Sequence, residues 1–162
     1  MAITANGLIA GNDDETDWLT KEEADSYCAA VRKAGCLIVG RRTYHILTKQ
    51  PEFQAFKDAK LVVVSHDAVE LVDPRHAVAS TPKEAVAILS DFAEIIVAGG
   101  GILNASFLAE NLVDEIFLDI EPVVLGNGIP LFKGTDFERN LKLLEQKMLS
   151  KNEIQLHYQV VK

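Results

Sequence analysis

Three consecutive glycines, Gly99, Gly100 and Gly101, separate a short apolar run (residues 95–98) from an amphipathic segment. A buried strand, a glycine-rich turn and a helix in this order bring free backbone N–H groups to a positive helix end, and that arrangement binds phosphate. The alternative is a tight turn that needs a positive φ. Asn104 stands where the pattern G-x-G-x-x-G has its last glycine, so that fingerprint is absent. Three glycines exceed the need of a usual turn, and we expect a phosphate or a nicotinamide to approach them.

A second junction of this kind reads Gly40-Arg41-Arg42-Thr43 and follows the apolar run 36–39. Arginines at the start of a helix oppose its dipole, which is unfavourable unless an anion is bound there. The alternative is a solvated pair that bridges surface carboxylates. Ser65-His66 ends the next apolar run, 61–64, and would add a hydroxyl and an imidazole to the same sheet edge. Ligands of open α/β sheets lie outside the carboxyl ends of the strands, so the three junctions suit an extended phosphorylated ligand such as a dinucleotide.

Glu23 is the best candidate for an acid. It lies one helical turn before Tyr27, beside the apolar face of a predicted helix, where partial desolvation would raise the pKa of its carboxyl and let it deliver a proton. The alternative is a structural role, because Glu23 is also the last residue of a capping box that starts at Thr20 and could bond back to the Thr20 amide.

Two further residues near these candidates have open interpretations. Asp119 interrupts an apolar strand, and it is either the polar face of an alternating strand or a second carboxylate in a cleft. Trp18 precedes the capping box and is either a core anchor or a pocket wall.

The composition excludes several classes of protein. The 162 residues suit one domain, residues 1–162, and the net charge of −8 argues against nucleic acid as a partner because phosphate neutralisation needs clustered Lys and Arg. The start of the chain does not resemble a signal peptide, and no window is apolar enough to span a bilayer. The four scattered histidines and the spacing of Cys28 and Cys36 predict no metal site. We expect reduced thiols and a cytoplasmic protein that binds a small molecule.

The order of the elements predicts an α/β fold. The runs 36–39, 61–64 and 95–98 are short and rich in β-branched residues, as in strands buried on both faces of a parallel or mixed sheet. Helices are predicted from residue 20 to about 33, from 81 to about 89 and from 103 to about 110. Residues 141–149 and 153–161 flank a turn and predict a C-terminal antiparallel hairpin.

Taken together, the motifs resemble the dihydrofolate reductase superfamily, and most closely the riboflavin-biosynthesis reductase (RibD C-terminal) domain family. The segments that carry this likeness cover nearly the whole chain and read ITANGLIAG, DWLTKEEAD, LIVGRRTY, VVVSHD, IIVAGGGILNASFL and LVDEIFLDIEPVVLGNGIPLF. The resemblance implies a central mixed, mostly parallel sheet of about eight strands with flanking helices. It also implies NADPH as the hydride donor, and a monomer or a homodimer.

The resemblance also implies a role for each candidate residue. The cofactor would bind to the two glycine-bearing junctions, to the end of the run 61–64 and to a loop over the nicotinamide. The junction residues are Gly40, Arg41, Arg42, Thr43, Gly99, Gly100 and Gly101, the residues at the end of the run are Ser65 and His66, and the loop residues are Ile9 and Ala10. Trp18 would close that loop, and Glu23 matches the family's acid, so capping and catalysis are compatible. Tyr27 and Ile46 would line the substrate cleft. Asp119 stands where dihydrofolate reductases tend to have a threonine, and here it would border the substrate as a second carboxylate beside Glu23.

Three functions follow from this reading. The first is reduction of a C=N bond in a pterin-like substrate, with 7,8-dihydrofolate as the leading guess, which GRRTY and the compact length favour and which would place the chain in folate metabolism. The second is the riboflavin-biosynthesis reductase acting on 5-amino-6-(5-phosphoribosylamino)uracil or a related aminopyrimidine, which the segment from GGG to PLF favours. The third is a non-catalytic NADPH-binding protein. A family segment D-P-x-L-T-x-R is missing and its place reads TYHILTKQPEF, which ranks the first function above the second.

Overall fold

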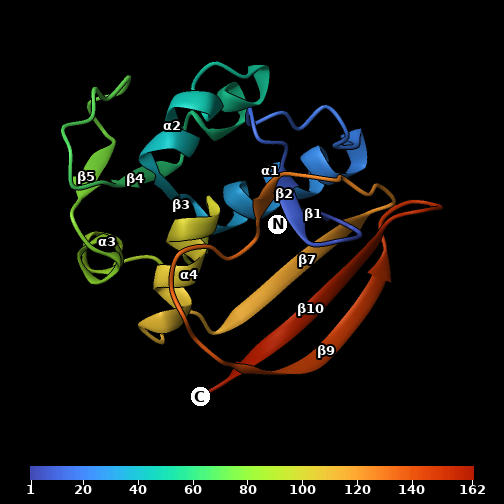
Figure 1. Cartoon of the computed structure of the whole chain (residues 1–162). Helices are drawn as coiled ribbons and strands as arrows, with labels where there is room; N and C mark the ends of the chain where they lie inside the picture. The colour runs from blue at the N-terminus through green and yellow to red at the C-terminus, as the bar shows by residue number, and fades with distance from the viewer.

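The computed structural model describes the backbone of residues 1–162 and the side chains of residues 1–51 and 53–162 (Figure 1). In it, strand β3 (Cys36–Gly40) is an inner strand of a four-stranded parallel sheet of order β5-β4-β3-β6. Its partners are β4 (Lys60–Val64) and β6 (Ile96–Val97), and β5 (Ala77–Ala79) pairs with β4. Residues 36–39 of β3 are fully buried. The prediction of strands covered on both faces is therefore confirmed for β3 and β4.

Alternate residues of β3 enter two different hydrophobic cores. Leu37 and Val39 pack in one core with the helix α1 (Lys21–Ala34), α2 (Arg41–Leu47) and the 3₁₀ helix η1 (Pro51–Phe56). Cys36 and Ile38 pack in the other with α3 (Pro82–Ile88) and α4 (Gly101–Ala109). The period of two along the strand thus places helices on both faces of the sheet.

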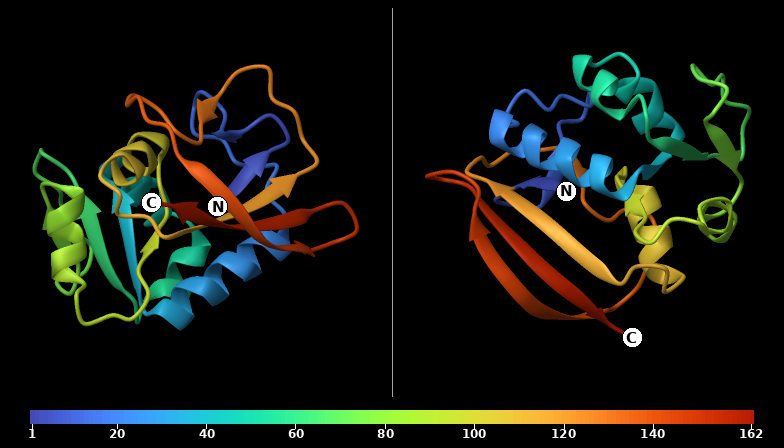
Figure 2. Two further views of the ribbon diagram at one scale, coloured as in Figure 1. Left: turned by 90° about the horizontal axis from the view of Figure 1, so that it is seen from below. Right: turned by 180° about the vertical axis from the view of Figure 1, so that it is seen from behind.

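Helix α1 begins and ends where local chemistry dictates. Thr20 is its N-cap and accepts a hydrogen bond from the Glu23 N–H, and Gly35 ends it in a left-handed conformation with its N–H on the Val31 carbonyl. The helix runs between the two larger sheets in the rear view (Figure 2, right). The predicted helix starting after Thr20 is confirmed.

The second sheet has the order β1-β7-β10-β9 and combines β1 (Ala2–Thr4), β7 (Glu115–Glu121), β9 (Asn140–Met148) and β10 (Ile154–Val161). Strand β1 is parallel to β7, whereas β10 is antiparallel to both β7 and β9. The predicted C-terminal hairpin is therefore confirmed. A separate ribbon pairs β2 (Leu8–Ala10) with β8 (Ile129–Pro130) in antiparallel fashion.

The predicted single sheet of about eight mostly parallel strands is wrong, because the strands do not all pair into one sheet. The described backbone forms two four-stranded sheets and one two-stranded ribbon, and only the β5-β4-β3-β6 sheet is wholly parallel. Strand β6 has two residues and pairs with β3 on one side, while β1 has three residues and pairs with β7. Such short strands leave no ladder to join the two sheets.

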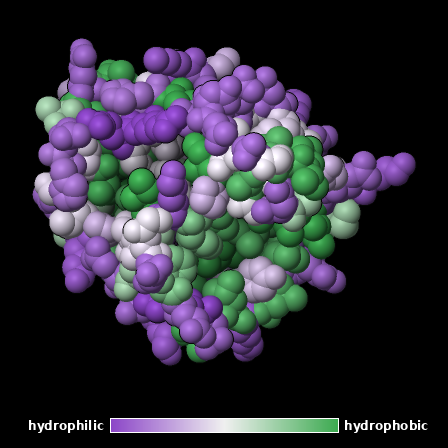
Figure 3. Space-filling model, in the orientation of Figure 1, coloured by the Kyte–Doolittle hydropathy of each residue, from purple (hydrophilic) through white to green (hydrophobic). Residues whose placement is uncertain are grey.

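The sheet that contains the hairpin exposes apolar side chains. Every residue of β9 is exposed, including Leu143 and Met148, and apolar atoms gather over β7, β10 and β9 on the face shown in Figure 3. Within the described part of the chain, no helix has the length and apolar character needed to cross a membrane.

Tyr44 carries a buried polar link inside the first core. Its hydroxyl oxygen accepts a hydrogen bond from the Val72 N–H (3.0 Å) and lies 2.9 Å from Nδ1 of His76. Burial lowers the pKa of His76, so the ring is neutral and its Nδ1 can accept the Tyr44 proton. The link fixes the loop before β5 to helix α2.

Tyr44→Phe leaves the buried His76 Nδ1 atom without its partner and the part-buried Val72 N–H without its acceptor. We expect a loss of about 1–3 kcal/mol in the free energy of unfolding, measured by urea titration. Tyr158→Phe is the matched control, because Tyr158 is half-buried and the described residues give its hydroxyl no hydrogen bond. Equal losses in the two variants would contradict the role given to the Tyr44 hydroxyl.

Candidate functional site

The two glycine-bearing junctions meet at the carboxyl ends of β3 and β6. The Gly40 N–H donates a 2.8 Å hydrogen bond to the Gly99 carbonyl, and Gly99 has a φ of 82°. Only glycine adopts such a φ readily, so the turn interpretation holds for Gly99. The predicted proximity of the two junctions is also correct.

Gly100 and Gly101 differ in what surrounds them. A Cβ on Gly101 would overlap the Pro130 carbonyl oxygen, so this glycine lets α4 pack closely against β8. A Cβ on Gly100 would instead enter a space between the Thr43 hydroxyl oxygen, at 3.5 Å, and Ile9, at 4.0 Å. Gly100 is therefore the glycine whose missing side chain leaves room beside residues that were predicted to bind a cofactor. Helix α4 starts there without a side-chain cap, so its first amides are available to an anion.

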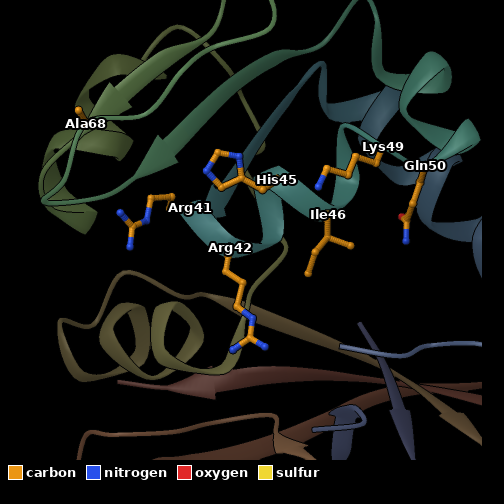
Figure 4. A pocket seen from close by; sticks show the side chains of 7 residues that line it. All are labelled: Arg41, Arg42, His45, Ile46, Lys49, Gln50 and Ala68. Carbon is orange, nitrogen blue, oxygen red and sulfur yellow. The ribbon is translucent and has the colours of Figure 1, made fainter. Parts of the chain in front are cut away.

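A basic pocket of about 590 Å³ runs along α2 and the turn after it (Figure 4). Arg42 and Ile46 point toward the side of α4, and Arg41 extends sideways from the start of α2, below Ala68 in this view. Two of the predicted cofactor residues and one predicted substrate residue thus share one helix face, and the pocket is lined by Arg41, Arg42, His45, Ile46, Lys49, Gln50 and Ala68. The sequence analysis missed His45 and Lys49, which follow Arg41 at helical spacings of four and eight.

Both arginines already have carboxylate partners. Arg41 pairs with Asp67 at 2.6 Å, and Arg42 pairs with Asp14 at 2.7 Å. This agrees with the surface-pair alternative, although all four side chains remain partly open to solvent and exposed pairs of this kind are weak. The Arg42–Asp14 pair ties the loop after β2 to the start of α2.

Ser65 and His66 do not enter the pocket. The Ser65 hydroxyl donates to the Asp67 carbonyl (2.9 Å) and accepts from the Asp67 N–H (3.1 Å), which stabilises a local turn after β4. His66 is exposed and is not among the lining residues. Their predicted place at the end of β4 is correct, and their part in binding stays a prediction.

The carboxyl of Glu23 does not cap α1, which was one of the two roles that the sequence left open. Its N–H donates to the Thr20 hydroxyl oxygen, but the Thr20 N–H donates to Glu121 Oε1 (3.2 Å) and not to Glu23. Only half of the predicted capping box forms. Among the described residues, the Glu23 carboxyl has no hydrogen-bond partner although it is buried.

Burial is the main cause that raises the pKa of Glu23 from 4.5 to about 7. The ammonium group of Met1 opposes this shift, and repulsion from Asp119, Glu121 and Glu153 adds to it. A carboxyl with a pKa near 7 is suited to deliver a proton at neutral pH. The predicted desolvation of Glu23 is thus correct.

Asp119 lies in the same buried group of carboxyls. Gln155 Nε2 donates a 2.7 Å hydrogen bond to its Oδ1, and the Met1 ammonium is 3.5 Å from its Oδ2. The Met1 side chain lies 3.3 Å from where a Cβ of Gly99 would be, so Met1 reaches both the glycine turn and the carboxyl group. Asp119 is inward-facing and close to Glu23, as the second-carboxylate interpretation requires.

Tyr27 lies beside Glu23, and Trp18 lies in the loop before α1. The Tyr27 ring packs edge-on against Phe56 with centroids 5.4 Å apart, and burial together with Glu23 raises the pKa of its hydroxyl. Trp18 is half-buried, and its indole N–H is buried without a hydrogen-bond partner among the described residues. Ala10 is buried in β2, next to Gly128.

No group of three metal-ligating side chains is present in the described part of the chain, and Cys28 and Cys36 are both buried and form no disulfide.

Comparison with known proteins fixes the family. The model of the RibD C-terminal domain matches residues 1–154. The chain belongs to the RibD C-terminal domain family. It is 30% identical over 165 residues to the uncharacterized protein YwjB of Bacillus subtilis (strain 168), an alignment that covers 98% of this chain and 94% of YwjB.

Solved structures show the same fold. A putative riboflavin biosynthesis protein from Shewanella sp. PV-4 superposes with a TM-score of 0.83 at 21% identity, covering 100% of this chain and 97% of the other. A diaminohydroxyphosphoribosylaminopyrimidine deaminase/5-amino-6-(5-phosphoribosylamino)uracil reductase from Thermotoga maritima has a TM-score of 0.72 at 17% identity, covering 99% of this chain and 55% of that one. The resemblance to the RibD C-terminal domain family drawn from the motifs is confirmed.

Within this RibD-type fold, two carboxyls were missed. Glu121 and Glu153 are fully buried beside Glu23. Glu121 could have been found, because it follows Asp119 by two residues and so shares its strand face. Glu153 could not, because only the pairing of β10 with β7, which sets Ile154 opposite Ile120, brings it near Glu121.

The raised pKa of Glu23 gives the RibD-type domain a pH-dependent stability. The unfolded chain releases this proton near pH 4.5 and the folded chain near pH 7, so the folded state binds more protons between these values and loses stability as the pH rises through that window. Glu23→Gln removes this titration. We expect the free energy of unfolding of the variant, relative to that of wild type, to be higher at pH 8 than at pH 4.5 by up to roughly 3 kcal/mol. Urea titrations at the two pH values measure the difference, and parallel behaviour of the two proteins would contradict it.

Proposed function

We propose that this chain is an NADPH-dependent reductase of the riboflavin-biosynthesis type, acting on 5-amino-6-(5-phosphoribosylamino)uracil or a related aminopyrimidine. The observation that carries the proposal is the match to the RibD C-terminal domain over residues 1–154. The Thermotoga maritima protein of like fold supports it, because its name includes the reduction of this aminopyrimidine. The sequence ranked a pterin substrate first, and the comparisons favour the aminopyrimidine instead.

The residues around the glycine turn fit NADPH. The space beside Gly100, bounded by Thr43 and Ile9, is a cradle that a Cβ would fill. The uncapped start of α4 and the basic pocket along α2 offer amides and cations to phosphates in a chain of net charge −8. When bound, NADPH supplies the hydride.

Glu23 would supply the proton. Reduction of a C=N bond takes a hydride at carbon and a proton at nitrogen, and an acid with a pKa of about 7 is partly protonated at neutral pH. Arg42 would hold a cofactor phosphate in place of Asp14, and Thr43 would hydrogen-bond to it. Trp18 and Tyr27 would exclude water from the acid. Ile46 and Asp119 would border the substrate.

The substrate is tested by following NADPH oxidation with the aminopyrimidine ribosyl phosphate and with 7,8-dihydrofolate in separate reactions. We expect turnover of the aminopyrimidine, and a reduction of kcat on the order of 10²-fold or more in Glu23→Gln, with NADPH affinity retained. Turnover of dihydrofolate alone would restore the pterin substrate. Tight NADPH binding with turnover of neither would support the non-catalytic function.

Arg42 tests the place of the cofactor phosphate. We expect Arg42→Ala to weaken NADPH more than NADH, because NADPH carries an additional phosphate that a guanidinium binds well. Lys83→Ala is the control, since Lys83 is an exposed cation paired with Glu110 away from the pocket. Calorimetric titration measures both affinities, and equal weakening of the two nucleotides would move the phosphate elsewhere.

A further inference from the structure

Two buried glutamates meet one hydroxyl at the start of α1. Glu121 from β7 and Glu153 from the turn before β10 are both fully buried. Glu121 Oε1 lies 3.1 Å from Thr20 Oγ1, and Glu153 Oε2 lies 3.0 Å from the same atom. Their other oxygens, Glu121 Oε2 and Glu153 Oε1, are buried without a hydrogen-bond partner among the described side chains and backbone.

The hydroxyl of Thr20 cannot serve both glutamates as a donor. A hydroxyl has one proton and two lone pairs, and one lone pair of Thr20 already accepts the Glu23 N–H at 3.1 Å. Thr20 can therefore donate to one carboxylate only. The contact with the second carboxyl is a hydrogen bond only if that carboxyl is protonated and donates to Thr20, which then uses all of its hydrogen-bonding capacity.

The backbone indicates which glutamate holds the proton. The Thr20 N–H also donates to Glu121 Oε1, at 3.2 Å, so this oxygen receives two donors and behaves as a carboxylate. Glu153 receives no backbone donor at its carboxyl in the described structure. Two unshared buried negative charges on one hydroxyl would also be strongly unfavourable.

We propose that Glu153 carries a proton at neutral pH and donates it to Thr20, so that Glu153 and Glu121 together fasten the first turn of α1 and position Glu23. The proton on Glu153 is independent of the proposed function, whereas the positioning of Glu23 for a reaction rests on it. Glu121 and Glu153 are positioning residues, because they act on Glu23 through Thr20.

The charges around Glu153 agree with a neutral carboxyl. Burial is the main cause that raises its pKa, and the carboxyls of Glu121 and Asp119 on β7 and of Glu22 on α1 add to the shift, while the hydrogen bond with Thr20 opposes it. Glu23 on α1 shares this field, and the Met1 ammonium lies beside Asp119. An opposite charge directly on Glu153 is not present among the described ion pairs.

Carboxyl ¹³C NMR on the glutamate-labelled protein tests where the proton is. The measurement uses the Glu23→Gln background, so that the titration of Glu23 does not interfere. We expect one glutamate carboxyl to remain in its protonated position at pH 7, to disappear in Glu153→Gln and to persist in Glu121→Asp, which keeps a negative charge beside Thr20. Persistence of that signal in Glu153→Gln, or its absence from the starting protein, would overturn the proposal. This test does not depend on any enzymatic activity.

A second experiment tests the positioning of Glu23. Glutamine at position 153 is neutral and can donate an N–H to Thr20, so Glu153→Gln should keep the urea midpoint and kcat of wild type at pH 7. Glu153→Ala lacks the donor, and we expect kcat to fall on the order of tenfold to a hundredfold while the KM for NADPH is retained. Equal damage by Gln and Ala would show that Glu153 acts as a carboxylate and would refute the proposal. Absence of turnover in wild type with the NMR result intact would refute the proposed function alone.

Discussion

Burial of β3 on both faces is the constraint on which the rest of the structure depends. Its alternate side chains fill two cores, one under α1 and α2 and one under α3 and α4. A strand held from both sides cannot shift its register without exposing one core. The carboxyl end of β3 is therefore fixed, and Gly40 at that end is held to Gly99 by a backbone hydrogen bond. This strand therefore fixes the positions of the space beside Gly100 and of the basic face of α2.

The second constraint is electrostatic. Four carboxyl side chains are buried where α1 meets the hairpin sheet, namely Glu23, Asp119, Glu121 and Glu153. Such a group cannot be fully ionised in a low-dielectric site, so it must hold protons or find donors. Thr20 donates to Glu121 and accepts from Glu153, and Gln155 donates to Asp119, whereas Glu23 keeps an unpaired carboxyl with a raised pKa. The carboxyl without a hydrogen-bond partner is thus the one whose raised pKa best suits proton transfer.

Local patterns in the sequence predicted most of the elements. The cap at Thr20, the buried runs of β3 and β4 and the hairpin of β9 and β10 each depend on residues within a few positions of one another. The single eight-stranded sheet was wrong because the division of the strands into separate sheets depends on pairing between segments far apart in the chain, which the pattern of apolar residues does not reveal.

The sequence by itself determined the two glycine-bearing junctions, the basic pair Arg41-Arg42 and the family, and it singled out Glu23 as the candidate acid, because each rests on residue types at short spacings. Only the tertiary structure decided that the Thr20 amide binds Glu121 and not Glu23, and that Glu153 shares the Thr20 hydroxyl. Those contacts join residues 101 and 133 positions apart in the chain. Their existence depends on the register of β10 against β7 and on where α1 crosses that sheet, which no local pattern specifies.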